Sequence, residues 1–120
     1  MSQEIKTINN VDIAFLHSDE VLIYDVQTAL DVLAEASYVG GCDCLVLNKE
    51  AFADEFFVLS SGLAGAVLQK FVQYRMKLAI VGDFSGYTSK PLQDFIRECN
   101  AGYGPYFVTN EDEAAERLTL

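Results

Sequence analysis

Two short segments of the sequence carry side chains that could bind a ligand or accept a chemical group. The first is Leu59-Ser60-Ser61-Gly62-Leu63-Ala64-Gly65, which places two hydroxyls and two glycines at the start of a predicted helix. Free N–H groups and the positive end of the helix dipole favour an anion at such a position. A phosphate could bind there through Ser60, Ser61 and Gly62, or be attached covalently to a serine. The alternative is that Ser60 or Ser61 only caps the helix.

The second segment is Gly82-Asp83-Phe84-Ser85-Gly86-Tyr87-Thr88-Ser89, which follows a predicted buried strand and precedes another helix. A carboxylate that lies near hydroxyls and a helix start could orient a ligand or act as a base. Asp83, Ser85 and Tyr87 are the candidate binding residues of this segment. The alternative is that Asp83 caps its own turn while Ser89 caps the helix.

The other chemically active residues match no catalytic or metal-binding pattern. Cys42, Cys44 and Cys99 lack the Cys-x-x-Cys spacing of zinc sites. His17 is the only histidine, and nothing in the sequence brings it to a cysteine to form a nucleophilic pair. The glycine-rich phosphate motifs Gly-x-Gly-x-x-Gly and Gly-Lys-Ser/Thr are also missing. We therefore expect no metal, no cofactor and no catalytic residue, and an enzyme ranks third among the functions considered.

Strands that alternate with helices must position the two segments. Val11, Ile13 and Phe15 show the two-residue period of a strand, and Asn9-Asn10 before them suits a tight hairpin turn. Apolar positions three and four residues apart indicate amphipathic helices after the caps Asp25 and Ser89. The patterns predict an opening extended segment, strands at 11–16, 44–47, 78–81 and 106–108, and helices at 25–40, 62–75, 89–102 and 110–118.

This order predicts one α/β domain over residues 1–120, with a mixed sheet of four to five strands and about four helices. The strands at 44–47 and 78–81 are apolar on both faces, so we expect them to be parallel neighbours in the sheet centre. Both candidate segments then lie beyond the carboxyl ends of the strands, where α/β sheets bind ligands. A pocket between Gly62 and Asp83 would favour ligand binding, and a closed, dry sheet end would favour protein interaction.

The stretch from Asn48 to Leu59 fits no regular element. We expect its three phenylalanines, Phe52, Phe56 and Phe57, to cover the sheet. Aromatic side chains that remain exposed on a loop are costly in water. The exposed remainder of these three rings is therefore the candidate surface for a two-fold homodimer.

Composition restricts the class of protein further. The chain has 120 residues, is 51% hydrophobic and carries a net charge of -10. This apolar content excludes disorder, and no apolar run is long enough to span a membrane. The first residues lack the basic and apolar parts of a secretory signal, and an odd number of cysteines favours reduced thiols in the cytoplasm. Eight basic against eighteen acidic residues argue against nucleic-acid binding.

The negative charge is concentrated in the first half of the chain. Residues 1–60 contain two basic and eleven acidic residues, whereas residues 61–120 contain six and seven. This excess forms either a solvated face that keeps the domain soluble or a surface that selects a basic partner protein.

The segment around Ser61 resembles a known regulatory motif. Residues 59–68, Leu-Ser-Ser-Gly-Leu-Ala-Gly-Ala-Val-Leu, are similar to the Asp-Ser-Ser-Gly-Leu-Gly region of the STAS-domain anti-sigma-factor antagonists. The resemblance implies a STAS-like sheet and places the phosphoacceptor serine at Ser61. Leu59 occupies the position of that family's acidic residue.

Three longer stretches, residues 62–71, 77–84 and 95–100, resemble an uncharacterised bacterial family, domain of unknown function 4180. That family brings no known activity. The sequence predicts a non-enzymatic cytoplasmic regulatory module that binds a protein partner, and the resemblance to the STAS-domain antagonists implies a switch by phosphorylation at a helix N-terminus. The alternative is a small-molecule or anion-binding domain that uses the loop–helix starts at Ser61 and Asp83.

Overall fold

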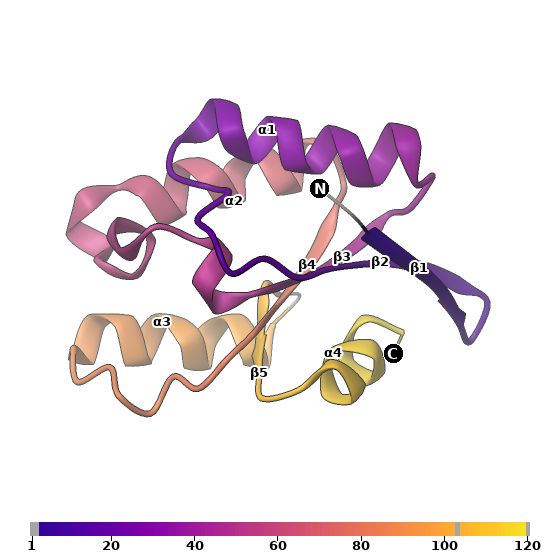
Figure 1. Ribbon diagram of the computed structural model, residues 1–120. Coiled ribbons are helices and arrows are strands. Elements are labelled where there is room, and N and C mark those ends of the chain that lie inside the picture. The colour runs from indigo at the N-terminus through magenta and orange to yellow at the C-terminus, as the bar shows by residue number, and fades with distance from the viewer. Residues whose placement is uncertain (1–2, 103, 120) are drawn as a thin grey trace.

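A five-stranded sheet forms the centre of the computed structural model, which describes residues 3–102 and 104–119 (Figure 1). Its spatial order follows the sequence, β1-β2-β3-β4-β5. The first pair is antiparallel and the other three pairs are parallel, which confirms the predicted mixed sheet. The strands are β1 (Gln3–Ile8), β2 (Val11–Leu16), β3 (Cys44–Asn48), β4 (Lys77–Val81) and β5 (Tyr106–Val108).

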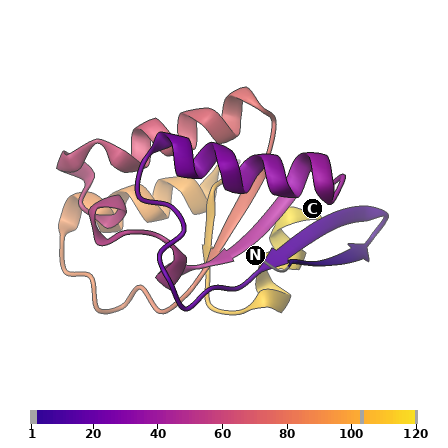
Figure 2. The ribbon, with the colours of Figure 1, turned by 45° about the horizontal axis from the view of Figure 1, so that its top comes forward.

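The opening hairpin is set by its two-residue turn. Asn9 and Asn10 have φ values of 53° and 66°, a backbone region that asparagine tolerates better than most residues. This turn pairs Ile8 with Val11 and fixes the register of β1 on β2. The hairpin extends beyond the helices on one side of the molecule (Figure 2).

Four α-helices lie among the described residues and cover the sheet, in agreement with the predicted number, and three of them join consecutive strands. Three of these helices begin at a side-chain cap: the Asp25 side chain accepts a hydrogen bond from the Thr28 N–H, Ser89 from the Leu92 N–H and Asn110 from the Glu113 N–H. The first helix continues into a π-helical turn, Glu35–Val39, and stops at Gly40. The helices are α1 (Val26–Ala34), α2 (Leu63–Gln73), α3 (Lys90–Ala101) and α4 (Glu111–Leu118).

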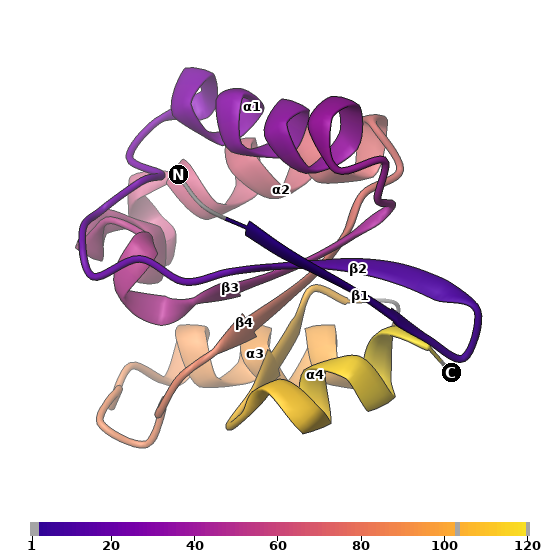
Figure 3. The same cartoon turned by 45° about the vertical axis from the view of Figure 1, so that its right-hand side comes forward.

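The sheet buries two unequal apolar faces. Side chains of α1, α2 and α3 form one large cluster with the first face, which includes Leu47 and Ile80. The second face, which includes Phe15 and Val46, packs against the short helix α4. Figure 3 shows α1 and α2 side by side on one side of the sheet and α4 on the other. Every residue of β3 is buried and β3 pairs with β4 in parallel, so the two predicted central strands are confirmed.

Three short 3₁₀ turns occupy the stretch that the sequence leaves unassigned, Lys49–Ala51, Asp54–Phe57 and Leu59–Ser61. Phe52, Phe56 and Phe57 cover the sheet as expected, and their side chains are 2%, 1% and 6% exposed. The prediction that these rings leave an exposed homodimer patch is therefore wrong. The rings contact one another instead, with centroids 4.6 to 6.3 Å apart.

Among the described residues, no helix has both the length and the apolar character needed to cross a membrane.

Candidate functional site

Ser61 lies at the start of α2, where the sequence places it. The turn Leu59–Ser61 leads into Gly62, whose φ of 81° is a conformation that glycine adopts without strain. Gly62 therefore holds the N-cap position. The Ser61 hydroxyl donates to the Glu55 carbonyl at 2.6 Å and accepts from the Leu63 N–H at 3.2 Å. Both Ser60 and Ser61 are exposed to solvent.

Asp83 and Ser85 form a turn that satisfies its own polar groups. One Asp83 carboxylate oxygen accepts the Ser85 N–H at 2.9 Å and the Ser85 hydroxyl at 2.6 Å. The hydrogen bond from the Ser85 hydroxyl, and to a smaller extent that from the Ser85 N–H, lowers the pKa of Asp83 below its usual value. Ser89 accepts the Leu92 N–H and caps α3. The segment therefore has the local capping roles that the sequence allows as its alternative.

Aromatic rings fill the space between the two segments. The Phe57 ring stacks on Tyr87 with centroids 5.2 Å apart, and Phe84 lies 6.2 Å from both of these rings. Phe107 extends the cluster, since the centroid of its ring lies 5.2 Å from that of Phe84. These contacts join the aromatic segment that precedes Gly62 to the Asp83 segment, so side chains close this part of the sheet end.

Lys49 is a residue of this region that sequence reasoning missed. Its Nζ donates to the Asp83 carbonyl at 3.0 Å and lies 5.2 Å from the centroid of the Tyr87 ring. A Cβ added at Gly82 would lie 2.7 Å from the Lys49 Cβ, so glycine is required for the lysine stem to cross there. One signal existed, since Lys49 is one of only two basic residues among the first 60.

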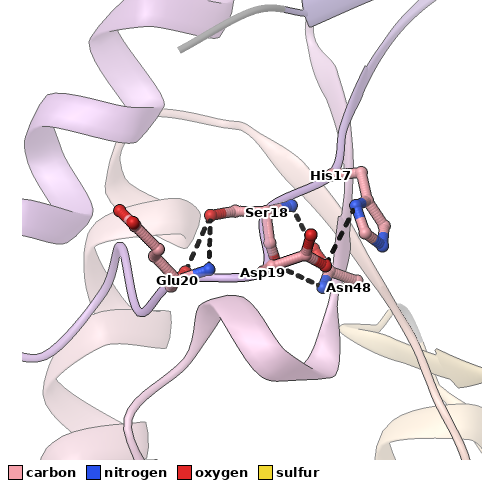
Figure 4. A network of polar contacts seen from close by, with 5 residues as sticks. All are labelled: His17, Ser18, Asp19, Glu20 and Asn48. Carbon is pink, nitrogen blue, oxygen red and sulfur yellow. Dashed lines mark hydrogen bonds and ion pairs between the residues drawn. The ribbon is translucent and has the colours of Figure 1, made fainter.

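A second missed residue, Asn48, is a buried polar side chain at the end of β3. It is 6% exposed, its Oδ1 accepts the Ser18 N–H at 2.9 Å, and its Nδ2 donates to the Ser18 carbonyl at 2.6 Å (Figure 4). Asn48 therefore holds the chain that leaves β2 against the end of β3. His17 follows β2 at the surface, with its Nδ1 4.0 Å from an Asp19 carboxylate oxygen.

A hollow of about 410 Å³ opens beside Asn48, on the second face of the sheet. Its lining combines apolar side chains with the acidic residues Glu4 and Glu111. Two negative charges make this hollow unfavourable for a phosphate or another anion. The lining residues are Glu4, Phe15, Leu16, His17, Val46, Asn48, Val81 and Glu111.

The family described as a domain of unknown function (DUF4180) matches residues 8–118, nearly the whole sequence. The chain belongs to the DUF4180 family. This match confirms the resemblance stated from residues 62–71, 77–84 and 95–100. A search of the curated proteins and a search of the solved structures each found no match.

The thiols of this DUF4180 protein are poorly suited to nucleophilic chemistry. Burial raises the pKa values of Cys42 and Cys44, and burial with the nearby Glu98 raises that of Cys99 to about 11. All three thiols are free and protonated at neutral pH. Within residues 3–102 and 104–119, no three His, Cys, Asp or Glu side chains form a group that could hold a metal ion.

Proposed function

We propose that this DUF4180 chain is a single regulatory domain that binds a protein partner in the cytoplasm through the surface around Ser61. The closed part of the sheet end beside Asp83 carries the proposal, because the rings of Phe57, Phe84 and Tyr87 pack against one another where a ligand of this segment would bind. Outside this packing, the turn that leads into α2 faces solvent. The resemblance of residues 59–68 to the STAS-domain antagonists supports the same assignment.

The proposed contact surface has an apolar centre and an acidic rim. Val58 is 52% exposed, and Ser60 and Ser61 beside it are also exposed. Asp54 and Glu55 are exposed on the preceding turn. A protein partner with an apolar contact and basic groups at its edge would match this arrangement.

Phosphorylation of Ser61 would change this surface in two ways. It would remove the hydroxyl proton that Ser61 donates to the Glu55 carbonyl. It would also place a dianion beside the N-terminal N–H groups of α2, where the helix dipole stabilises it. A partner that rests on Val58 would then have to desolvate the dianion, so we propose that phosphorylation releases the partner.

The Ser61 switch predicts a difference between two substitutions. Ser61→Asp is expected to reduce partner recovery by about tenfold, while Ser61→Ala keeps it, because only Asp places a charge beside Val58 that a bound partner must desolvate. Each variant loses hydrogen bonds worth roughly 0.5–2 kcal/mol in total, so both remain folded. Partner recovery would be measured by affinity purification from the native host, and intact mass would show whether the wild-type chain carries a phosphoryl group.

The neighbouring serine provides the matched control. Ser60 is also exposed but makes none of the hydrogen bonds of Ser61, so Ser60→Asp separates added charge in general from charge at the switch position. Equal recovery with Ser61→Asp and Ser61→Ala, together with no phosphoryl mass, would contradict the switch. It would leave Ser61 as a residue that only stabilises the turn.

A second candidate function, small-molecule binding, is favoured by the hollow beside Asn48 rather than by the sheet end at Asp83. Its mixed lining of apolar residues and two acidic residues suits a compact ligand with an amino group. We expect propylamine to shift the NMR signals of the Asn48 side-chain amide and propionate to leave them unchanged. Glu111→Gln should weaken the amine response. Equal shifts with both probes, or none with either, would exclude this selectivity.

A further inference from the structure

The outer edge of β1 is an unpaired strand in the part of the chain that the structure describes. β1 pairs with β2 on one side only and ends the sheet. The two-residue turn makes Ile8 and Val11 a hydrogen-bonded pair. From there, hydrogen-bonded and non-hydrogen-bonded residue pairs alternate along β1 and β2. The N–H and C=O groups of Ile8, Lys6 and Glu4 therefore face β2. Those of residues 3, 5 and 7 face outward.

From this geometry we infer that β1 pairs antiparallel with β1 of a second copy, so that two sheets join into one across a two-fold axis at Ile5. In this register, Ile5 lies opposite Ile5 of the second copy, and residue 3 lies opposite residue 7. All of these residues present their backbone groups outward, so the junction forms about six hydrogen bonds. The register involves no group that already pairs with β2.

The charges of the strand fit the same register. Glu4 and Lys6 flank Ile5, and their side chains lie 3.9 Å apart on one face of the strand. Around an axis at Ile5, each Glu4 faces Lys6 of the other copy in a non-hydrogen-bonded pair, with Cα atoms about 4.5 Å apart. Two opposite-charge contacts therefore form in place of like-charge contacts. In a chain with a net charge of -10, this edge is locally neutral.

Exposed apolar surface gives a second reason for the pairing. The Ile5 side chain is 46% exposed although it lies in a strand, and the two-fold axis brings it against its own copy. Lys6 also covers the Phe15 ring, with Nζ 4.9 Å from the ring centroid. An edge lysine commonly prevents sheets from joining. In the proposed register, Glu4 of the second copy lies opposite Lys6, so this lysine pairs with a carboxylate and does not keep the sheets apart.

The test measures association of the full chain with any tag placed after Leu120, by analytical ultracentrifugation over roughly 1 µM to 1 mM. We expect the wild-type chain to dimerise reversibly within this range. Lys6→Glu places two pairs of carboxylates against each other and should weaken dimerisation by about tenfold or more. The double variant Glu4→Lys with Lys6→Glu exchanges the charges and should restore dimerisation to the wild-type level.

A proline substitution tests the backbone contacts separately. Ile5→Pro removes an outward N–H that β2 does not use, so the hairpin should tolerate it while the dimer loses its two central hydrogen bonds. Circular dichroism would show that this variant remains folded. A wild-type chain that stays monomeric up to the highest concentration would overturn the inference. The inference would also be overturned if Lys6→Glu and Ile5→Pro left the strength of dimerisation unchanged. The same holds if the β1 edge paired only with a different protein.

Discussion

Replacement of Ile80 by Asp is expected to leave the chain largely unfolded at room temperature. Ile80 is fully buried in β4, opposite Leu47 of β3 in the large cluster of the first face. Loss of the aliphatic side chain alone costs about 2–5 kcal/mol, and burial of an unpaired carboxyl group adds several more. A domain of this size has a total stability of about 5–15 kcal/mol. Far-UV circular dichroism and urea denaturation would measure the loss.

The conservative variant Ile80→Val is the control for this prediction. It removes one methylene group and should lower the free energy of unfolding by only about 0.5–1.5 kcal/mol. A cooperative urea transition for Ile80→Asp near that of the wild-type chain would show that β4 is not in the core. The valine variant would then also show no loss.

The second large effect is expected for Phe56→Ala. The Phe56 ring is 1% exposed and lies 4.6 Å from the centroid of Phe52 and 5.1 Å from that of Phe57. Its removal leaves a cavity that the neighbouring rings fill incompletely, at a cost of about 3–5 kcal/mol. Chemical denaturation followed by circular dichroism would measure this change.

Val58 provides the comparison within the same segment. It lies two residues further along and is 52% exposed, so Val58→Ala should change the free energy of unfolding by less than about 0.5 kcal/mol. If both variants lost the same small amount of stability, the aromatic segment would not be packed on the sheet. The conclusion that side chains close the sheet end beside Asp83, on which the proposed function depends, would then be wrong as well.

The elements of this fold could be predicted because their signals are local. Asp25, Ser89 and Asn110 each precede an amphipathic pattern, and each accepts a helix N–H in the structure. A capping residue acts within one turn of itself, so the sequence window contains both partners of the interaction. The apolar run of β3 was equally informative, because only a strand covered on both faces dispenses with polar residues.

The aromatic segment could be placed only in part. The spacing of Phe52, Phe56 and Phe57 indicates a surface that must be covered, but it does not distinguish packing inside the domain from packing between two copies. The 3₁₀ turns there are too short to show a period in the sequence. Phe57, for example, packs against Tyr87, a residue far along the chain that no local pattern connects to it.

The candidate site shows the same division. The position of Ser61 before α2 follows from a local pattern, whereas the hollow beside Asn48 combines Glu4 from the first strand with Glu111 from the last helix. No local window contains such a pair. The role of Lys49 could not be predicted for the same reason, because its contacts with Asp83 and Tyr87 depend on the parallel pairing of β3 and β4.

The short helix α4 has a consequence for how the protein is made. Its residues Ala114, Ala115 and Leu118 cover the second face of a sheet whose first four strands end by residue 81. Until α4 has emerged from the ribosome, the nascent sheet therefore exposes Phe15 and Val46 to water or to a chaperone. Domains generally fold as units. Emergence of α4, rather than emergence of the sheet, is the step that allows the second face to be covered.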